Sequence, residues 1–323
     1  MGSEALADYL NARRAEVEAA LERFLPSAPL CPPIVAEAMR YSLIAGGKRL
    51  RPILTLAAAE TLATRPSTGS GRPELAEGRN SGCTPEQARA LAMPAACAIE
   101  FIHTYSLIHD DLPAMDDDSM RRGRPTLHVV HGEGIAILAG DGLLTEAFAL
   151  MAREPPDATL TARKLRTIET VASAAGAIGM VGGQALDLQA VGAASMLDTT
   201  ALRAMHARKT GALIRASAAA GAIMAGGDGP TIVAVEGYGS HLGVAFQIVD
   251  DILDVEGEAA RLGKTAGKDA KAGKPTYPSL YGLEDSRRLA DAEIGNALQA
   301  LRAAGLDRGP LADIASWVVS RTN

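Results

Sequence analysis

The residues Ile99–Arg124, IEFIHTYSLIHDDLPAMDDDSMRRGR, combine an apolar, helix-patterned run with five aspartates and three arginines. Ser106 and Asp110 are four residues apart and therefore share one face of a helix. Pro113 ends that helix, because it has no N–H and restricts the residue before it. We expect Asp116 to return from a turn toward Asp110. Carboxylates that converge at a helix end either take up protons or bind divalent cations, and the neighbouring arginines favour a metal-assisted diphosphate site.

A second aspartate cluster lies in Phe246–Asp254, FQIVDDILD. Asp250 and Asp254 are four residues apart, about 40° around a helix, so their carboxylates share a face. Like charges at this spacing destabilise an ordinary helix unless a cation bridges them. From Asp110 to Asp250 the two clusters are 140 residues apart. We therefore expect them to form two walls of one cavity, with metal ions between them.

Four motifs in a fixed order carry a resemblance: GGKRLRP at 46–52, DDLPAMD at 110–116, KTGALI at 209–214 and DDILD at 250–254. Together they resemble the short-chain polyprenyl diphosphate synthases of bacteria, and within that family the farnesyl diphosphate synthases. The match runs from about Val35 to the C-terminus, apart from Ala63–Thr84. One aspartate motif alone is shared with terpene cyclases, whereas all four in this order are specific. The resemblance implies an enzyme that joins isopentenyl diphosphate to an allylic diphosphate by metal-assisted ionisation.

The resemblance also implies a set of site residues. The metal ligands would be six aspartates that hold Mg²⁺ or Mn²⁺, with three ions when substrate is bound: Asp110, Asp111, Asp116, Asp250, Asp251 and Asp254. The diphosphate of isopentenyl diphosphate would lie on Gly47, Lys48, Arg51, His103 and Arg122. The allylic diphosphate would lie on Arg121, Lys209, Lys264 and Lys274, and its reacting carbon near Thr210 and Gln247. A homodimer is a further implication.

Two basic segments also have simpler interpretations. Lys48, Arg49 and Arg51 could form a solvated turn, although glycines next to a helix start favour an anion site. We expect Arg49 to be the surface residue of the three. The stretch Gly257–Pro278, with its lysines, could be a solubilising linker. Because it directly follows a metal motif, we expect a lid that closes over the diphosphate.

The length of the product depends on the residues before the first aspartate motif. In the resembling enzymes an aromatic residue five positions before this motif blocks the elongation cavity, and Tyr105 holds that position here. On an ideal helix Tyr105 lies about 140° from Asp110, whereas Ser106 lies about 40° away and would line the cavity more directly. Because Tyr105 is aromatic, the C15 product, farnesyl diphosphate, is the main expectation. Because the helix geometry places Ser106 closer to Asp110, the C20 product, geranylgeranyl diphosphate, is the competing one.

Composition favours a helical protein that does not bind nucleic acid. Of the 323 residues 47% are hydrophobic but only 3% are aromatic, and alanine and leucine, both strong helix formers, dominate. The formal net charge of −6 argues against general nucleic-acid binding. Cys31, Cys83 and Cys97 have no metal-binding spacing and suit a reducing compartment. We find no secretion signal and no run of 18 apolar residues, so we expect a cytoplasmic protein without a transmembrane segment.

The expected fold is all-α, with residues 1–323 forming one domain of ten or more helices around a deep central cavity. We expect helices at Glu4–Phe24, Ile34–Ala45, Ile53–Leu62, Leu127–Met151, Thr161–Gln189 and Glu236–Asp254, with helical pattern again from Ser279 to Val319. Residues 63–84 are rich in Gly, Ser and Pro and are predicted to form a disordered surface loop. Gln184 and Asp187, three residues apart, could support the site from a neighbouring helix.

Three other functions remain open at this point. His109 and Asp110 could be the His-Asp pair of a metal-dependent phosphohydrolase, although that leaves the second aspartate motif unexplained. A non-catalytic subunit of a synthase would be expected to have lost one aspartate motif, and both are intact. A terpene cyclase needs no site for isopentenyl diphosphate, so the basic turn at Lys48 counts against it.

Overall fold

The protein is described by a computed structural model at residues 2–65, 83–190, 199–260 and 276–321. Its helices are α1 Ser3–Phe24, α2 Pro33–Leu43, α3 Leu50–Ala63, α4 Pro85–Asp110, α5 Leu127–His131, α6 Glu133–Arg153, α7 Thr161–Ala175, α8 Met180–Ala190, α9 Thr199–His206, α10 Ala212–Met224, α11 Gly229–Ala260, α13 Tyr277–Tyr281, α14 Leu283–Ala303 and α15 Pro310–Ser320. A short 3₁₀ turn, Ala158–Leu160, precedes α7, and a π-turn, Ala207–Gly211, joins α9 to α10. The strands β1 Met120–Arg121 and β2 Arg124–Pro125 form a small antiparallel hairpin. The prediction of an all-α fold with ten or more helices is confirmed.

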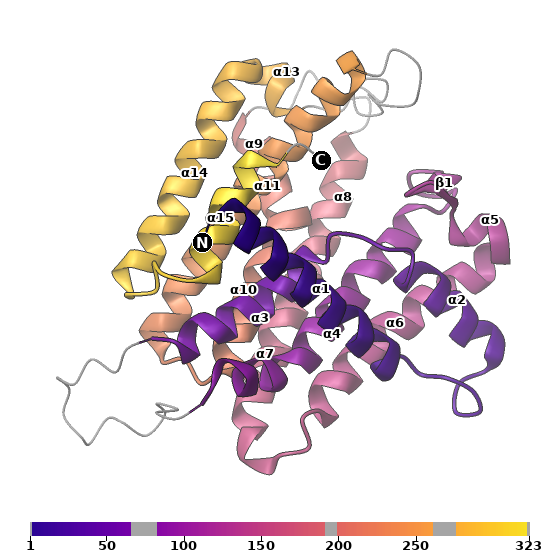
Figure 1. Cartoon of the computed structure of the whole chain (residues 1–323). Helices are drawn as coiled ribbons and strands as arrows, with labels where there is room; N and C mark the ends of the chain where they lie inside the picture. The colour runs from indigo at the N-terminus through magenta and orange to yellow at the C-terminus, as the bar shows by residue number, and fades with distance from the viewer. Residues whose placement is uncertain (1, 66–82, 191–198, 261–275, 322–323) are drawn as a thin grey trace.

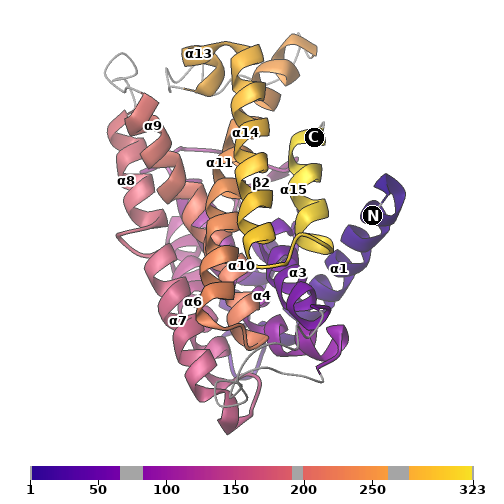
Figure 2. The same cartoon turned by 90° about the vertical axis from the view of Figure 1, so that its left-hand side faces the viewer.

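The helix α4 lies at the centre of the bundle and contacts α1, α3, α6 and α10 (Figure 1). It begins with a capping box in which the Thr84 hydroxyl accepts from the Gln87 N–H and the Gln87 side chain accepts from the Thr84 N–H. On the other side of α10 the long helix α11 packs along α14, and α7 and α8 follow one edge of the molecule (Figure 2). The first aspartate motif therefore begins at the end of α4, and the second, residues 250–254, lies in the last third of α11.

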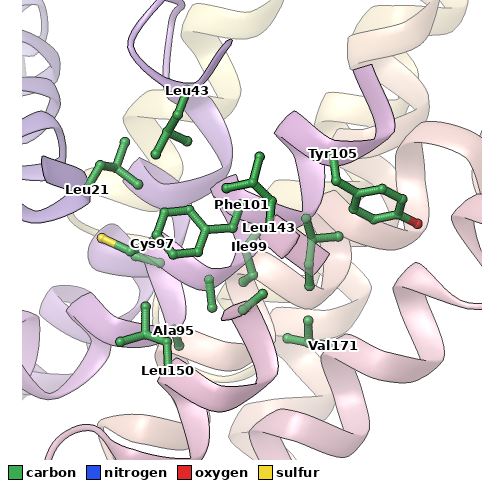
Figure 3. Packing of buried hydrophobic residues seen from close by; sticks show 14 of the residues in the cluster. Leu21, Leu43, Ala95, Cys97, Ile99, Phe101, Tyr105, Leu143, Leu150 and Val171 are labelled. Atoms are coloured by element: carbon green, nitrogen blue, oxygen red, sulfur yellow. The ribbon is translucent and has the colours of Figure 1, made fainter. Parts of the chain in front are cut away.

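The main core surrounds the middle of α4 and combines large and very small side chains. Phe101, Ile102 and Leu143 are fully buried, and many alanines of α4 and α6 lie between them (Figure 3). Small residues allow the helix axes to approach one another, and packing at this density fixes the direction of α4. Tyr105 lies at one end of this cluster, apart from Phe101 (Figure 3). The core thus holds the helix whose last two turns carry site residues.

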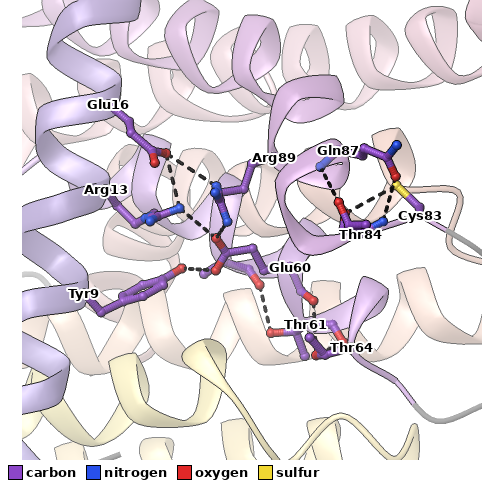
Figure 4. Close-up of polar contacts among 11 residues, drawn as sticks. Tyr9, Arg13, Glu16, Glu60, Thr61, Thr64, Cys83, Thr84, Gln87 and Arg89 are labelled. Carbon is purple, nitrogen blue, oxygen red and sulfur yellow. Dashed lines mark hydrogen bonds and ion pairs between the residues drawn. The ribbon is translucent and has the colours of Figure 1, made fainter.

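A buried charge network fastens the first helix to the core. The Glu60 carboxylate, 6% exposed, accepts hydrogen bonds from the Tyr9 hydroxyl at 2.7 Å, from Arg13 at 3.0 Å and from Arg89 at 2.7 Å (Figure 4). These residues come from α1, α3 and α4. A carboxylate with three donors satisfies the requirement that a buried charge be paired. The network makes α1 a covering helix, as its sequence pattern predicts.

Several helix boundaries differ from the predicted ones. The predicted helix Leu127–Met151 is broken at Gly132, where a φ of +81° ends α5 and starts α6. The predicted helix Thr161–Gln189 is likewise divided into α7 and α8. The α11 helix extends beyond Glu236–Asp254 at both ends. Of the predicted loop, Ala63 still belongs to α3 and Thr84 caps α4, while residues 66–82 lie outside the described part of the chain.

Four helical segments are long and apolar enough, by length and composition, to cross a membrane: Pro85–Asp110, Glu133–Arg153, Ala158–Ala190 and Gly229–Glu256. In α4, 72% of the apolar window is buried inside the protein, so its apolar character serves the core. In α6 only 39% of the window is buried, which leaves an apolar surface on the outside. That no segment spans a membrane stays a prediction.

Candidate active site

The first aspartate motif folds back on itself where α4 ends. Pro113 follows the helix end, and the backbone N–H of Asp116 donates to the carbonyl oxygen of Asp110 at 2.9 Å. The N–H of Asp118 donates to the carbonyl oxygen of Asp111 at 3.2 Å. The turn predicted from the proline is therefore present, and it brings Asp116 back to the end of α4.

The Asp110 carboxylate lines the cavity in a poorly hydrated position. Burial raises its pKa to about 6; the positive charge of Lys209 opposes this shift, and the negative charge of Asp116 adds to it. A carboxylate that is buried beside other carboxylates favours either a proton or a cation. Asp110 is therefore a carboxylate whose ionised form a bound cation would stabilise.

Asp111 is engaged differently from Asp110. Its carboxylate accepts three hydrogen bonds from the Arg121 guanidinium, at 2.7, 2.9 and 3.0 Å. Both residues line a smaller neighbouring pocket instead of the main cavity. Burial raises the pKa of Asp111, and the bond to Arg121 opposes the rise. Arg121, which the resemblance assigns to the allylic diphosphate, is in this structure a partner of the first aspartate motif.

The hairpin between β1 and β2 carries Arg122 to the basic turn. Arg122 and Gly123 both have positive φ, 52° and 74°, as a tight two-residue hairpin turn requires. The Arg122 guanidinium donates to the carbonyl of Gly46. At Gly47, whose φ is +141°, a Cβ would lie 2.9 Å from the Arg122 guanidinium. The glycine thus permits the close contact that joins two predicted residues of the isopentenyl diphosphate site.

The prediction that Arg49 is a surface residue is wrong. Arg49 is 3% exposed; its guanidinium donates to Glu100 at 2.7 Å and to the carbonyl of Leu43 at 2.7 Å. Its backbone is left-handed, with φ +52°, and caps the start of α3. A buried ion pair with Glu100 of α4 therefore anchors the basic turn from behind.

Arg51 and His103 meet in the wall of the cavity. Arg51 Nη1 lies 3.3 Å from His103 Nε2, and both residues line the cavity. Burial, and then the charge of Arg51, holds the pKa of His103 well below its usual value, so the imidazole is neutral. Burial and the charge of Arg321 lower the pKa of Lys48. The positive charges of Arg51 and Lys48, each held close to other cationic side chains, favour a bound anion here.

The second aspartate motif is held by three different partners. Asp250 pairs with Arg321 at 2.5 Å, and Asp251 accepts from the Gln247 amide at 2.9 Å and from the backbone N–H of Tyr277 at 3.0 Å. Burial raises the pKa of Asp250, and Arg321 opposes this rise. Gln247 thus contacts Asp251, which lies one full turn further along α11. Asp254 follows Asp250 by one turn and is half-buried.

Lys209 and Thr210 lie on the π-turn Ala207–Gly211. Lys209 Nζ forms an ion pair with Asp187 of α8 at 2.6 Å. The Thr210 hydroxyl donates to the side-chain amide oxygen, Oε1, of Gln247 at 3.0 Å. Asp187, which the sequence suggests as a supporting residue, therefore contacts a predicted substrate-binding side chain directly.

A cavity of about 380 Å³ is lined by residues of α3, α4, α8 and the π-turn, together with Met115; the described residues Asp250, Asp251 and Asp254 of the second motif do not line it. Its charged end includes Arg51, His103, Asp110, Lys209 and Thr210. Its apolar walls include Tyr105, Met115, Met180, Val181, Ala185 and Leu188. Tyr105 and Ser106 both line it, so the ideal-helix argument that favoured Ser106 does not exclude Tyr105. The arrangement suits a molecule with a charged head and a hydrocarbon tail.

The motif side chains fit a hard divalent cation by their chemistry, because all of them are carboxylates. Within the described ranges, no group of three or more His, Cys, Asp and Glu side chains converges closely enough to hold an ion. Arg121 and Arg321 instead neutralise Asp111 and Asp250. Guanidinium groups thus already provide positive charge at these carboxylates. Their positions indicate where a bound cation would be favourable.

Two residues near the site were missed by sequence reasoning, and two predicted ones cannot be placed. Arg321 follows the last helix with no motif around it, and Tyr277 contributes only its backbone N–H, so neither gives a sequence signal. Lys264 and Lys274 lie outside the described residues. The prediction of a closing lid there stays a prediction.

The chain matches the family model described as polyprenyl synthetase over residues 32–304. The farnesyl diphosphate synthase of Geobacillus stearothermophilus is 41% identical over 321 residues, 99% of each chain. The farnesyl diphosphate synthase of Escherichia coli is 44% identical and 94% of each chain is covered. The geranylgeranyl diphosphate synthase of Cyanophora paradoxa is 40% identical, with 98% of this chain and 97% of that one covered.

A solved structure agrees with these relatives. The apo structure of an FPP/GFPP synthase from Zymomonas mobilis superposes with a TM-score of 0.77 at 34% identity, covering 98% of this chain and 99% of that chain. The shared fold, the matched family model and the near-complete coverage at about 40% identity all indicate the same relationship. This chain belongs to the polyprenyl synthetase family.

Proposed function

We propose that this protein is a prenyltransferase that condenses isopentenyl diphosphate with dimethylallyl and geranyl diphosphate, with farnesyl diphosphate as its main product. The observation that carries the proposal is the division of one cavity into a charged end, with Asp110, Lys209 and Arg51, and apolar walls. Such a cavity can hold a diphosphate where positive charge is available and a hydrocarbon tail where water is excluded. Residues 1–323 form, in this proposal, a single polyprenyl synthase domain.

The allylic diphosphate is bound between the two aspartate motifs. Mg²⁺ or Mn²⁺, three ions with substrate bound, would be held by Asp110, Asp111, Asp116, Asp250, Asp251 and Asp254. Bound there, the ions supply charge stabilisation for the departing diphosphate. Lys209 donates to the diphosphate oxygens, with Arg121, Lys264 and Lys274 as further donors. Since Lys209 already pairs with Asp187, its ammonium is held at the charged end of the cavity before substrate arrives.

The carbon–carbon bond forms beside Thr210 and Gln247. The allylic C1–O bond breaks, and its electron pair leaves with the diphosphate. The oxygens of Thr210 and Gln247 face the resulting allylic cation and stabilise it without forming a bond. The double bond of isopentenyl diphosphate, held by Gly47, Lys48, Arg51, His103 and Arg122, attacks C1. A proton is then lost to the released diphosphate, which restores a double bond.

The two diphosphate sites of this proposal can be tested by measuring the KM for each substrate in variants of each site. Lys48→Ala and Arg51→Ala should raise the KM for isopentenyl diphosphate at least roughly tenfold and leave the allylic KM within about twofold, because a charged hydrogen bond is worth about 1.5–3 kcal/mol. Lys209→Ala and Lys264→Ala should do the reverse. Initial rates with one substrate varied at a time measure both constants. Equal losses for both substrates in all four variants would show that the two sites are not separate.

Geranylgeranyl diphosphate is the competing product, because relatives of nearly equal identity include a geranylgeranyl diphosphate synthase. A His-Asp phosphohydrolase is disfavoured by the direction of His109. Its Nε2 lies 3.1 Å from the carbonyl of Ile137, and a Cβ at Gly140 would come within 2.2 Å of the same nitrogen. The imidazole thus points into α6 and away from the carboxylates of the motif.

We also propose that the protein is a cytoplasmic homodimer with α5 and α6 in the interface. Val129, Val130, Ile137 and Leu138 of these helices are about half exposed, an apolar surface that a second copy could cover. Cys31, Cys83 and Cys97 are all free thiols, as expected in a reducing compartment.

A further inference from the structure

The π-turn Ala207–Gly211 is held between two helices, α8 on one side and α11 on the other. A π-turn is rare and often marks a functional site, because it places an extra residue in one helical turn. Here it sends Lys209 toward α8 and the adjacent Thr210 toward α11. The placement of both side chains therefore depends on how closely the two helices approach the turn.

Each helix presents a glycine to the π-turn. A Cβ at Gly183 of α8 would lie 2.2 Å from the backbone nitrogen of Lys209 and 2.6 Å from the Cα of Lys209. A Cβ at Gly243 of α11 would lie 2.7 Å from the Cα of Gly211. Real Cβ atoms do not come within 3.0 Å of such neighbours. Neither glycine has a left-handed backbone, so backbone conformation does not require glycine at these positions. Glycine is required because the helices pack so closely against the π-turn.

The polar partner of each site residue follows its glycine by four residues. Asp187 follows Gly183 on α8, and Gln247 follows Gly243 on α11, so glycine and partner share a face of each helix. The Lys209–Asp187 distance of 2.6 Å and the Thr210–Gln247 distance of 3.0 Å both depend on this approach. A backbone contact and a side-chain contact thus fix the π-turn from each side.

We infer that Gly183 and Gly243 are positioning residues that set where Lys209 and Thr210 meet the allylic substrate. The inference rests on the proposed function, which assigns those two side chains to the diphosphate and to the reacting carbon. A methyl group at either glycine would push the π-turn away and separate the side chains from their partners. A displacement of about 1 Å at a reacting centre costs on the order of 10²-fold in rate.

The structure offers a closely matched control on the same helix. Gly239 lies one turn before Gly243 on α11, and its Cβ would also lie 2.7 Å from a backbone Cα, that of Arg215 in α10. The next two distances, 3.4 and 3.5 Å, are the same at both positions. Gly239→Ala therefore inserts the same methyl group between α11 and α10, beyond the π-turn, at the same distance from the facing backbone.

The test compares Gly243→Ala with Gly239→Ala in three measurements. We expect kcat with dimethylallyl diphosphate to fall roughly 10²-fold in Gly243→Ala and by less than about threefold in Gly239→Ala. Calorimetry with an allylic analogue that carries sulfur in place of the bridging oxygen should show weaker binding in Gly243→Ala alone. The KM for isopentenyl diphosphate should change less than about twofold in both, and the thermal midpoints should fall together.

Three results separate the possible failures. Equal kcat and equal analogue affinity in the two variants would overturn the inference. A Gly243→Ala protein that does not fold, beside a folded Gly239→Ala protein, would assign Gly243 to stability and overturn it too. Wild-type protein that binds the analogue but transfers no prenyl group would contradict the proposed function instead.

Discussion

Asp110 stands out at the residue scale because its charge is useful for metal binding and unfavourable for folding. Burial raises its pKa from 3.8 to about 6, which corresponds to on the order of 3 kcal/mol for the ionised form. The pKa of Asp110 is higher in the folded protein than in the unfolded one. Protonated Asp110 therefore contributes fully to folding stability below pH 4, and this contribution is lost as the pH rises through 6. The metal-free protein is thus destabilised at neutral pH by a group that the proposed reaction requires.

We therefore predict that Asp110→Asn raises the thermal midpoint of the chelator-treated protein at pH 7.5, although it should reduce turnover by several orders of magnitude. The gain should shrink below pH 6 and vanish near pH 4, where the wild-type carboxyl is protonated as well. Calorimetric melts across this pH range measure it. The exposed Asp291 of α14 gives the control, because Asp291→Asn should leave the midpoint unchanged. A metal-free variant that melts below wild type at pH 7.5 would refute the argument.

Tyr105 is the residue that should limit product length. It is 8% exposed, lines the cavity and lies edge-on to His109 with ring centroids 5.6 Å apart. Tyr105→Ala should open the apolar end and give C20 or longer products, whereas Tyr105→Phe, which keeps the ring, should still stop at C15. Chromatography of the dephosphorylated products measures chain length. If Tyr105→Ala stayed active and still released C15, the boundary would lie at Ser106 or the helices opposite.

Single residues also show where sequence reasoning ends. The turn after Pro113 was predictable because proline acts on its immediate neighbours. Burial of Arg49 was not, since its partner Glu100 is 51 residues away and no local pattern announces the pair. The same holds for Arg321 and Asp250, which are 71 residues apart. Contacts within a turn can be read from sequence, and ion pairs between helices cannot.

At the scale of elements, α6 carries an apolar surface that the described part of the chain leaves exposed. Leu138 is 54% exposed on this helix, and we predict that Leu138→Glu shifts a dimer toward monomer, because a charge in an apolar interface is costly. Light scattering after size-exclusion chromatography gives the mass. Val233→Glu is the control, since Val233 is 65% exposed on α11, away from α5 and α6. A Leu138→Glu protein that keeps the wild-type mass would remove α6 from the interface.

Helix boundaries were predicted less well than helix existence. The break into α5 and α6 was missed although residues 131–134, HGEG, interrupt the apolar pattern with two glycines, because the pattern continues on both sides of them. The π-turn was missed for a related reason, because Lys209 and Thr210 continue an ordinary helical pattern. The π-turn is packed against α8 and α11, and it carries two site residues.

For the whole molecule, the scarcity of aromatic residues and the order of four motifs predicted the fold class and the family. They also predicted that the two aspartate motifs face one cavity; Asp110 lines the cavity, whereas Asp250, Asp251 and Asp254 do not, so a shared cavity stays a prediction. The composition could not predict how the carboxylates are neutralised in the protein alone, which depends on Arg121 and Arg321. The chemistry of the motifs was thus more predictable than the contacts that hold them.

The most direct test of the central claim is a product analysis. The purified protein is incubated with Mg²⁺, isopentenyl diphosphate and, in turn, the C5, C10 or C15 allylic diphosphate, and the chains are separated after removal of the diphosphate. The account predicts C15 from the C5 and C10 substrates, no extension of the C15 substrate, and loss of all products in excess chelator. Release of phosphate without any longer chain, or full activity in chelator, would contradict it.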